Sequence, residues 1–290
     1  MTINVTQSQY QPIAPVTGTT RLFGCIASPT DHVRAPMIFN QIFTERGIDA
    51  VMVPVNIPPA QLQQGIAGLQ AMENFYGAAV TIPHKLTLAD LCDELGPGAQ
   101  AAAAVNAVRF DPDGRLYGDN FDGHGFVAGL LGENPADEAP DAIVNGKSIL
   151  IVGAGGAARA IALSLSEHRV GCVDVMNRTH SRAEEAVQLV HRLRDDAPVT
   201  ALPAEKVAFD SYDIVINATP LGLHEDDALP LEIERLGPEC LVCDIIMIPE
   251  RTNLIEAAEQ SGRPVHIGRH MLDYQIDLIG SFIGAYQKNP

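Results

Sequence analysis

The 290-residue sequence is poor in basic side chains, with 19 lysines and arginines against 36 aspartates and glutamates. The formal net charge is therefore −17 at pH 7, and we expect neither nucleic acid nor an anionic membrane as a partner. A local basic pocket can still bind an acidic substrate. The sequence also lacks any apolar run near the ~18 residues that a membrane helix needs. Residues 1–15 show no signal-peptide pattern.

Cysteine is also scarce, and the five residues are scattered along the chain at positions 25, 92, 172, 240 and 243. An odd, low count in a chain of this length indicates reduced thiols and a cytoplasmic location. Cys240 and Cys243 form a C-x-x-C motif, but they lie in an apolar strand pattern, in which residues three apart point to opposite faces. No second cysteine pair or histidine cluster completes a zinc site, so we interpret both as core residues and predict no metal.

The length suits about two domains, and 46% hydrophobic with 19% charged residues is typical of a folded protein. Short apolar strands alternate with longer amphipathic helices, which indicates a parallel α/β sheet. The first such elements are expected at residues 21–26, 36–46, 50–55, 59–72 and 77–81.

A stretch rich in Glu, Asp, Pro and Gly, residues 132–146, separates two α/β parts of the chain. We place the hinge slightly earlier, near residues 122–126, followed by a connecting helix. Residues 269–286 have the pattern of a helix with one apolar face, which we expect to pack back on the first domain. The predicted domains are therefore residues 1–123 with 260–290, and residues 124–259.

The most specific motif is a strand, a glycine turn and a helix over Ile149–Ala162, with the fingerprint Gly153-x-Gly155-x-x-Ala158. Gly153 allows the tight turn, Gly155 lets the backbone approach a pyrophosphate, and Ala158 permits close packing of helix on strand. The helix N-terminus then offers N–H groups to the phosphates. A turn without a ligand would not need three small residues at these offsets, so we predict a bound dinucleotide.

The end of the next strand, residues 171–176, indicates which dinucleotide binds. Domains that bind NAD usually carry an acidic residue here for the ribose 2′-hydroxyl. This chain instead has Arg178, Thr179 and Arg182, and two guanidinium groups with a hydroxyl suit a 2′-phosphate. We therefore predict NADP rather than NAD. The alternative is a solvated basic helix start, although arginine opposes the helix dipole there unless an anion is bound.

Two further strands of the same domain end in polar turns, at residues 214–217 and 241–246. Ligands bind at the carboxyl edge of such sheets. Asn217, Thr219 and Leu221 are therefore candidate neighbours of the cofactor. For each of them, ordinary turn chemistry is the alternative.

The first domain has three segments in which polar residues follow apolar ones: residues 81–85, 104–107 and 118–123. Lys85, Asn106 and Asp122 would converge if three neighbouring strands ended at one sheet edge. A lysine beside a carboxylate is a suitable pair for the proton transfer that accompanies hydride transfer between NADP and a hydroxyl group. Taken singly, a surface lysine and ordinary Asx turns would explain these residues.

Together these motifs resemble the shikimate dehydrogenase family, including its quinate-using members, over residues 21–286. The resemblance implies an α/β fold with an N-terminal substrate domain, a Rossmann-type NADP-binding domain and the active site in the cleft between them. It implies that Lys85 and Asp122 are the catalytic acid–base pair. The substrate hydroxyls would be held by Thr81, Asn106, Asp122 and Gln275. The cofactor-binding positions of the family correspond to Gly153, Ala154, Gly155, Gly156, Ala157, Asn177, Arg178, Thr179 and Gly268.

One segment, residues 29–36, departs from the family pattern. The family holds the substrate carboxylate with two serines, whose positions are occupied here by Val33 and Ala35, and Phe121 replaces the threonine before the catalytic aspartate. Loss of these hydroxyl groups is expected to lower the affinity for a carboxylate. Arg34 leaves two interpretations open: it binds the carboxylate in their place, or it is solvated and the pocket takes a less acidic or differently shaped ligand.

We therefore predict an NADP-dependent dehydrogenase that reversibly oxidises a hydroxyl of shikimate or of a similar cyclic polyol acid. One alternative is a dehydrogenase for quinate, an aminated analogue or another hydroxylated ring. Another is a regulatory protein that binds NADP or a metabolite without catalysis, and the intact set Lys85, Asn106 and Asp122 counts against it. The expected partner is a small ring hydroxy acid. A homodimer is expected only by analogy with similar folds.

Overall fold

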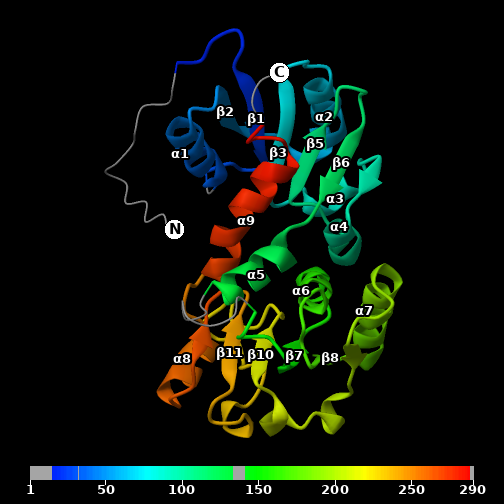
Figure 1. The fold of residues 1–290 in the computed structure, drawn as a ribbon, viewed down its shortest axis with the longest axis vertical. Coiled ribbons are helices and arrows are strands. Elements are labelled where there is room, and N and C mark those ends of the chain that lie inside the picture. The colour runs from blue at the N-terminus through cyan, green and yellow to red at the C-terminus, as the bar shows by residue number, and fades with distance from the viewer. Residues whose placement is uncertain (1–14, 32, 133–140, 288–290) are drawn as a thin grey trace. The chain divides into compact units, whose positions relative to one another are not determined.

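The computed structural model describes residues 15–31, 33–132 and 141–287. The chain forms two compact units, residues 1–121 with 276–290 (unit 1) and residues 122–275 (unit 2). Figure 1 labels most of their helices and strands, which are numbered in chain order. Residues 133–140 of the predicted acidic loop lie outside the described residues, as does most of the polar N-terminal segment. Within the described ranges, no helix is long and apolar enough to cross a membrane.

Unit 1 is built on a six-stranded sheet with the order β2-β1-β3-β5-β6-β4. Its strands are β1 (Arg21–Ala27), β2 (Ala50–Asn56), β3 (Phe75–Val80), β4 (Glu94–Leu95), β5 (Ala107–Phe110) and β6 (Leu116–Asp119). Its helices are α1 (Ala35–Arg46), the 3₁₀ turn η1 (Pro59–Gln61), α2 (Leu62–Gln70), α3 (Lys85–Ala89), α4 (Pro97–Ala102) and the part of α9 (Arg269–Phe282) from Ile276 onward.

The sheet of unit 1 is mixed: the three strands that led to the prediction of a parallel sheet are parallel to one another, but the sheet also contains an antiparallel strand. β1 pairs in parallel with β2 and β3, but β5 runs antiparallel to both β3 and β6. The physical reason is the short connection between β5 and β6, in which Asp111 N–H donates to the carbonyl of Arg115 at 3.1 Å. A turn this short permits only antiparallel pairing, whereas a parallel pair needs a long crossover.

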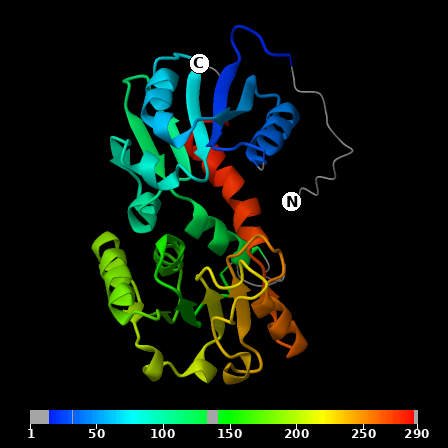
Figure 2. The ribbon, with the colours of Figure 1, turned by 180° about the vertical axis from the view of Figure 1, so that it is seen from behind.

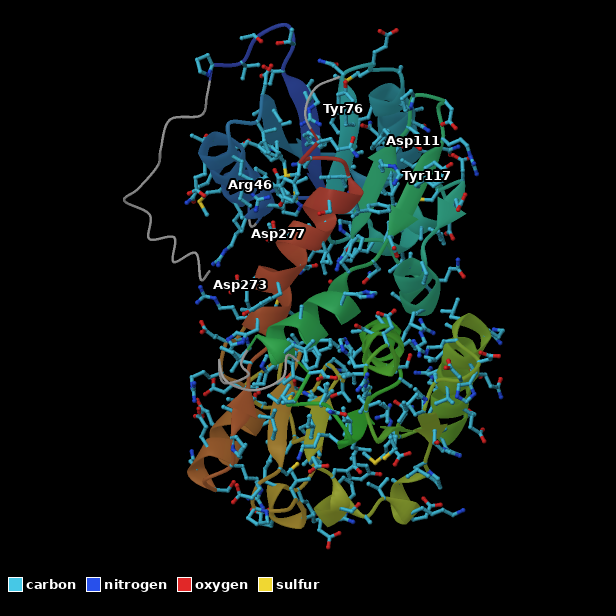
Figure 3. The ribbon with its side chains drawn as sticks, in the orientation of Figure 1. Arg46, Tyr76, Asp111, Tyr117, Asp273 and Asp277 are labelled. Carbon is cyan, nitrogen blue, oxygen red and sulfur yellow. The ribbon has the colours of Figure 1, made fainter. Side chains whose placement is uncertain are left out.

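Helices cover both faces of this sheet, and each face has its own apolar cluster. On one face α1 and α9 contribute Phe39, Phe43 and Ile279, which pack with Phe23 of β1. On the other face, residues of α2, α3 and α4 pack against β1, β3 and β5, and Figure 2 shows the sheet from behind. The first cluster is joined at its rim by an ion pair of 3.1 Å between Arg46 Nη2 of α1 and Asp277 Oδ1 of α9, both labelled in Figure 3. Burial of each of the three phenylalanine rings contributes about 2–3 kcal/mol.

Unit 2 contains a second six-stranded sheet, with the order β12-β11-β10-β7-β8-β9. All its pairings are parallel. Its strands are β7 (Ser148–Val152), β8 (Cys172–Met176), β9 (Val199–Ala201), β10 (Ile214–Asn217), β11 (Leu241–Asp244) and β12 (Val265–His266). Its helices are α5 (Asp122–Leu131), α6 (Gly156–Ser166), α7 (His180–Leu193), η2 (Ala204–Lys206), η3 (Phe209–Ser211), η4 (Ile233–Arg235), α8 (Asn253–Gln260) and the first half of α9.

This strand order is the one typical of dinucleotide-binding domains, and it confirms the predicted α/β class with a Rossmann-type domain. The predicted division placed residues after 259 in the first domain. In the structure β12 pairs with β11 through Val265 and His266, so these residues belong to the sheet of unit 2. The two units meet in the sequence within α9, between Gln275 and Ile276.

The cysteines of the C-x-x-C motif are core residues, as predicted. Cys240 and Cys243 are both buried and free. Burial raises the pKa of the Cys240 thiol to about 11 and that of the Cys25 thiol to about 12. Both groups are therefore neutral, unreactive thiols at physiological pH.

Candidate active site

The glycine turn lies at the carboxyl edge of the unit 2 sheet, where β7 and β10 are neighbours. The strand order reverses at this point, and ligands of such sheets bind there. Gly153 follows β7 with a φ of +121°, a backbone angle that side chains other than hydrogen rarely permit. A Cβ at Gly153 would lie 2.6 Å from the carbonyl oxygen of Ala218, which follows β10. Only glycine at position 153 therefore allows the ends of β7 and β10 to approach each other this closely.

The N-terminus of α6 points out of this turn without a capping side chain. Its N-cap residue is Gly155, which has no side chain to accept hydrogen bonds from the first amides. Ala158 is buried, which allows close packing of the helix, whereas Ala154, Gly156 and Ala157 are half-buried. The first N–H groups of a helix have no intrahelical acceptor. They suit a pyrophosphate, whose negative charge also favours the helix dipole.

The end of β8 is basic and leads directly into α7. The Nδ2 atom of Asn177 donates to the carbonyl oxygen of Thr179 at 2.9 Å, which shapes the turn. Arg178 and Arg182 are exposed, and neither forms an ion pair with any residue that the structure describes. Residues 177–182 include no acidic side chain. Two unpaired guanidinium groups beside a helix N-terminus are a suitable site for a phosphate monoester.

The ends of β10 and β11 are tied together by a buried polar pair. Asn217 and Asp244 are the last residues of their strands and are directly paired in register. The Oδ1 atom of Asn217 accepts from the Thr219 backbone N–H at 3.0 Å and from its hydroxyl at 2.7 Å. Asn217 is fully buried. Its side chain stabilises the turn after β10, which is the alternative to a cofactor contact that the sequence left open. Thr219 is half-buried at the same edge.

Asp244 has an unusual environment for a carboxylate. Burial raises its pKa, and the hydrogen bonds from the Ile246 N–H, the Thr252 hydroxyl and the Asn217 amide oppose that shift. Its pKa lies above the ordinary aspartate value. Asp244 was not among the predicted site residues. A carboxylate at the end of an apolar strand is nevertheless a detectable signal in the sequence, because such a group needs buried hydrogen-bond donors.

In unit 1 the backbone brings the lysine segment and the asparagine segment together. The N–H of Val105 donates a hydrogen bond of 2.8 Å to the carbonyl oxygen of Lys85. Asn106 is the next residue after Val105 and is therefore one residue away from this contact. Thr81 N–H donates to Ile26 at the end of β1, at 3.0 Å. Lys85 is half-buried at the first position of α3.

The direction of β5 determines at which end of its strand Asn106 lies. β3 and β6 end at this edge of the sheet, as expected, but Asn106 precedes β5 and therefore lies at the start of its strand. The condition under which the three residues were expected to converge, three strands ending at one edge, is not met by β5, because it runs antiparallel to both neighbours. Lys85 and Asn106 nevertheless lie at one edge of the unit 1 sheet, since the start of an antiparallel strand lies beside the ends of its neighbours.

Asn106 is 2% exposed, and its side chain hydrogen-bonds to the backbone of the residue before Asp122. Its Oδ1 atom accepts a hydrogen bond of 2.9 Å from the Phe121 N–H. Asp122 then begins α5, in unit 2. Within that unit, Gly125 of α5 lies directly against Gln275 of α9. Gln275 therefore lies about one helical turn along α5 from Asp122.

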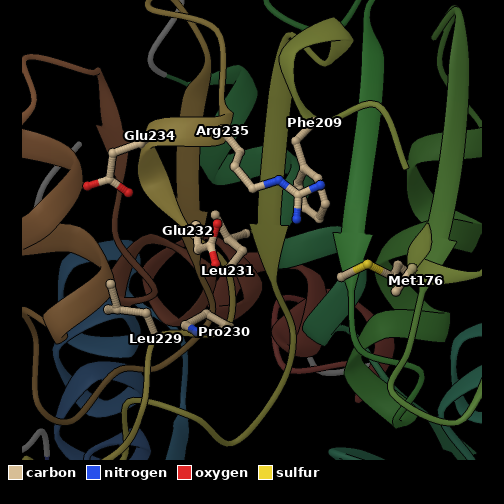
Figure 4. A pocket seen from close by; sticks show the side chains of 9 residues that line it. Met176, Phe209, Leu229, Pro230, Leu231, Glu232, Glu234 and Arg235 are labelled. Atoms are coloured by element: carbon tan, nitrogen blue, oxygen red, sulfur yellow. The ribbon is translucent and has the colours of Figure 1, made fainter. Parts of the chain in front are cut away.

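A pocket of about 370 Å³ is present elsewhere in unit 2, among η3, η4 and the end of β8. Figure 4 shows the residues that line it, and the Arg235 guanidinium lies 4.2 Å from the centre of the Phe209 ring. None of its lining residues is a predicted site residue.

The comparisons with known proteins agree with this geometry. The family profile described as "Shikimate dehydrogenase substrate binding domain" matches residues 25–108, and "Shikimate / quinate 5-dehydrogenase" matches residues 137–224. The shikimate dehydrogenase (NADP(+)) of Rubrobacter xylanophilus is 37% identical over 261 residues, covering 90% of this chain and 89% of that protein. The enzyme of the same name from Geobacillus kaustophilus is 36% identical, covering 88% and 89% of the two chains.

The chain belongs to the shikimate dehydrogenase family. The predicted family and enzyme class are thereby confirmed. Solved structures agree: the Listeria monocytogenes shikimate 5-dehydrogenase, in complex with shikimate and NAD, has a TM-score of 0.78 at 29% identity and covers 96% of both chains. The 5-ketofructose reductase of a Gluconobacter strain has a TM-score of 0.76 at 28% identity, covering 93% of this chain and 95% of that one.

The three residues that were predicted to depart from the family pattern share one environment. Val33, Ala35 and Phe121 are partly buried, and all pack against the apolar cluster under α1 and α9. Arg34 lies between them in sequence but is exposed at the N-cap position of α1. Its backbone carbonyl, not its side chain, accepts the first helical hydrogen bonds, at 3.1 and 3.2 Å.

Proposed function

We propose that this protein is an NADP-dependent shikimate dehydrogenase, which interconverts 3-dehydroshikimate with NADPH and shikimate with NADP. The observation that carries this function is the identity of 37% over 90% of the chain to a relative named shikimate dehydrogenase (NADP(+)). A Thermus thermophilus member of TM-score 0.74 and 27% identity was solved with NADP(H) and shikimate. The predicted cofactor and reaction agree with these relatives.

The residues at the carboxyl edge of unit 2 fit this cofactor. Gly153 and the N-terminus of α6 form a cradle for the pyrophosphate, and Arg178 with Arg182 and Thr179 suits the 2′-phosphate. Ala154, Gly156, Ala157, Asn177, Thr219 and Gly268 are the further proposed contacts. When bound, the reduced nicotinamide supplies the hydride to the substrate carbonyl carbon.

The protein supplies the proton for that step. In the direction of reduction, the Lys85–Asp122 pair donates a proton to the substrate oxygen as the hydride reaches carbon, and in the reverse direction it accepts this proton. Lys85 belongs to unit 1 and Asp122 to unit 2, so their pairing is part of the proposal. Thr81, Asn106 and Gln275 would hold the ring hydroxyls.

The apolar packing of Val33, Ala35 and Phe121 favours a second candidate substrate class. A carboxylate placed against these residues would lose its hydration without gaining hydroxyl donors, unless Arg34 turns toward it. A hydroxylated carbonyl compound without a carboxylate avoids this cost. One structural relative, at 28% identity, is named 5-ketofructose reductase, which supports this candidate.

The deciding experiment is steady-state NADP reduction by the purified protein with shikimate, quinate and an aminated analogue, repeated with NAD. We expect shikimate to be oxidised with NADP at the highest kcat/KM. NADPH oxidation with 5-ketofructose is measured in parallel, and a higher kcat/KM for it than for 3-dehydroshikimate would replace the first candidate with the second. Loss of shikimate affinity in Arg34→Ala would assign the carboxylate to Arg34.

A cytoplasmic location and a homodimer remain proposals. The first is supported by the free cysteines, of which Cys25, Cys240 and Cys243 are buried, and the second only by analogy with similar folds. Sedimentation velocity of the purified protein at several concentrations tests the homodimer.

A further inference from the structure

A buried carboxylate lies at the cofactor edge of unit 2, and none of the residues that the structure describes is a cationic partner for it. Asp244 is 1% exposed. It accepts from Asn217 Nδ2 at 3.2 Å to each oxygen, from the Ile246 N–H at 3.0 Å and from the Thr252 hydroxyl at 2.7 Å. All these donors are neutral. Burying a carboxylate among neutral donors costs free energy. Its presence despite this cost indicates that the position needs a side chain with two acceptor oxygens.

We propose that Asp244 is a positioning residue for cofactor binding, which holds three separate segments of this sheet edge in the arrangement that receives NADP. It contacts neither cofactor nor substrate and acts only through the residues bonded to it. The inference rests on the proposed function, because that function places NADP at this edge.

The first segment is the turn after β10. Asp244 accepts from the Nδ2 atom of Asn217, which fixes the direction of the Asn217 amide group. The Oδ1 atom then points to the N–H and hydroxyl of Thr219, and the Thr219 hydroxyl accepts from the Leu221 N–H at 3.1 Å. The carbonyl of Ala218 in this turn lies against Gly153. Asp244 therefore determines, through Asn217, one wall of the phosphate turn.

The second and third segments follow β11. Asp244 holds the Ile246 N–H and the hydroxyl of Thr252, which is also the N-cap of α8 and accepts from the Ile255 N–H at 3.3 Å. Gly268 lies directly on this segment, and a Cβ there would be 2.5 Å from the Ile246 carbonyl oxygen. A shift of residues 245–246 would therefore displace Gly268, a proposed cofactor contact.

The hydrogen-bond polarity explains why asparagine is a poor replacement for Asp244. A carboxamide has only one acceptor atom, so its NH2 group would take the place of an oxygen that accepts from Asn217 and, on one side, from the Thr252 hydroxyl, and these donors would lose an acceptor. If Asn217 turned its amide group over to restore its hydrogen bond, Thr219 would lose its acceptor. Asp244→Asn is therefore expected to disturb the Thr219 turn even though the two side chains have nearly the same shape.

The test compares Asp244→Asn with Asp213→Asn, the same substitution at the opposite end of the sheet, just before β10. We expect Asp244→Asn to raise the Kd for NADP by about tenfold, with a smaller change in kcat, and Asp213→Asn to change the Kd by less than about twofold. Hydrogen exchange of the cofactor-free protein gives a second readout. In Asp244→Asn, the amides of Thr219 and Leu221 should exchange faster than in the wild type and in Asp213→Asn.

Further variants separate positioning from a general loss of stability. Asn217→Asp should weaken NADP binding, because it places two carboxylates side by side. The double variant Asn217→Asp with Asp244→Asn restores one donor between them and should recover part of the affinity. If Asp244→Asn does not fold, Thr252→Val removes one donor and should raise the Kd for NADP, whereas Thr252→Ser should not.

Equal effects of Asp244→Asn and Asp213→Asn on the Kd, or unchanged exchange at Thr219 and Leu221, would overturn the proposal. Failure of the proposed function has a different signature: the wild-type protein itself would not bind NADP. In that case hydrogen exchange of the cofactor-free variants still tests whether Asp244 holds the turn.

Discussion

The Oδ1 atom of Asn106 accepts a hydrogen bond of 2.9 Å from the backbone N–H of Phe121. This contact fixes the chain one residue before Asp122, at the point where unit 1 ends and α5 begins. The backbone of Asn106 is held at the same time, since its N–H donates to Asp119 and its carbonyl accepts from Val80, at 2.9 and 2.8 Å. A proposed substrate-binding residue thus also supports the segment that carries a proposed catalytic carboxylate.

Asn106 is expected to have two separable functions. Asn106→Ala removes the acceptor for the Phe121 N–H, which should speed hydrogen exchange of that amide and lower kcat/KM for shikimate by about 10². Asn106→Asp keeps an acceptor, so the exchange rate should stay near the wild-type value while kcat/KM still falls, because the amide donor is lost. Wild-type kinetics in both variants would show that Asn106 serves neither purpose.

Lys85 and Asp122 are expected to carry the proton transfer. Lys85→Ala and Asp122→Asn should each lower kcat by about 10² or more, the usual contribution of a positioned acid or base. The Kd for NADP should not change, since neither residue is a proposed cofactor contact. Rapid-mixing measurement of NADPH formation in a single turnover checks the chemical step directly. Normal turnover in Lys85→Ala would remove it from the mechanism.

The preference for NADP over NAD is expected to depend on Arg178. Arg178→Ala should raise the Kd for NADP by about tenfold or more, because a charge-assisted contact to the 2′-phosphate is lost, and should leave the Kd for NAD nearly unchanged. Isothermal titration with both dinucleotides measures this difference. Arg192→Ala is the matched control, since Arg192 is an exposed arginine in the last turn of α7, the helix that begins just after Arg178. Equal weakening of NADP and NAD binding in Arg178→Ala would contradict the 2′-phosphate assignment.

Acid is expected to remove one identifiable contribution to stability, at Asp213. Burial raises the pKa of Asp213, but hydrogen bonds from the Ser148 N–H and Lys147, at 2.9 and 3.1 Å, outweigh it and leave the pKa below 3.8. A carboxyl with a lowered folded-state pKa stabilises above its unfolded pKa, and this stabilisation is lost as the pH falls through the folded value.

Urea unfolding of the wild type and Asp213→Asn between pH 7 and pH 3 tests this contribution. The difference in free energy of unfolding should be below about 1 kcal/mol, because the half-exposed pair is screened by water. It should be constant near neutral pH and shrink below about pH 4. A difference that grows on acidification would contradict the assigned direction of the pKa shift.

Local sequence patterns were sufficient to predict the elements whose causes are local. The strand, glycine turn and helix around Gly153 need only the apolar run, the small residues and the helix start, and the structure has them at Ser148–Val152 and Gly156–Ser166. The helix expected over residues 59–72 is instead a 3₁₀ turn followed by the shorter α2. The exact ends of a helix depend on capping and packing, and the local pattern of apolar and polar residues specifies these poorly.

The amino-acid sequence by itself determined the family, the dinucleotide motif, the missing acidic residue after β8 and the candidate site residues, since each of these lies within a short run of residues. Only the tertiary structure decided that β5 runs antiparallel and that Asn217 is buried in turn chemistry. It also revealed that Asp244 collects donors from three segments and that Val33, Ala35 and Phe121 share one apolar cluster. These properties arise between residues far apart in the chain, and their energies depend on burial and on partners that no local pattern contains.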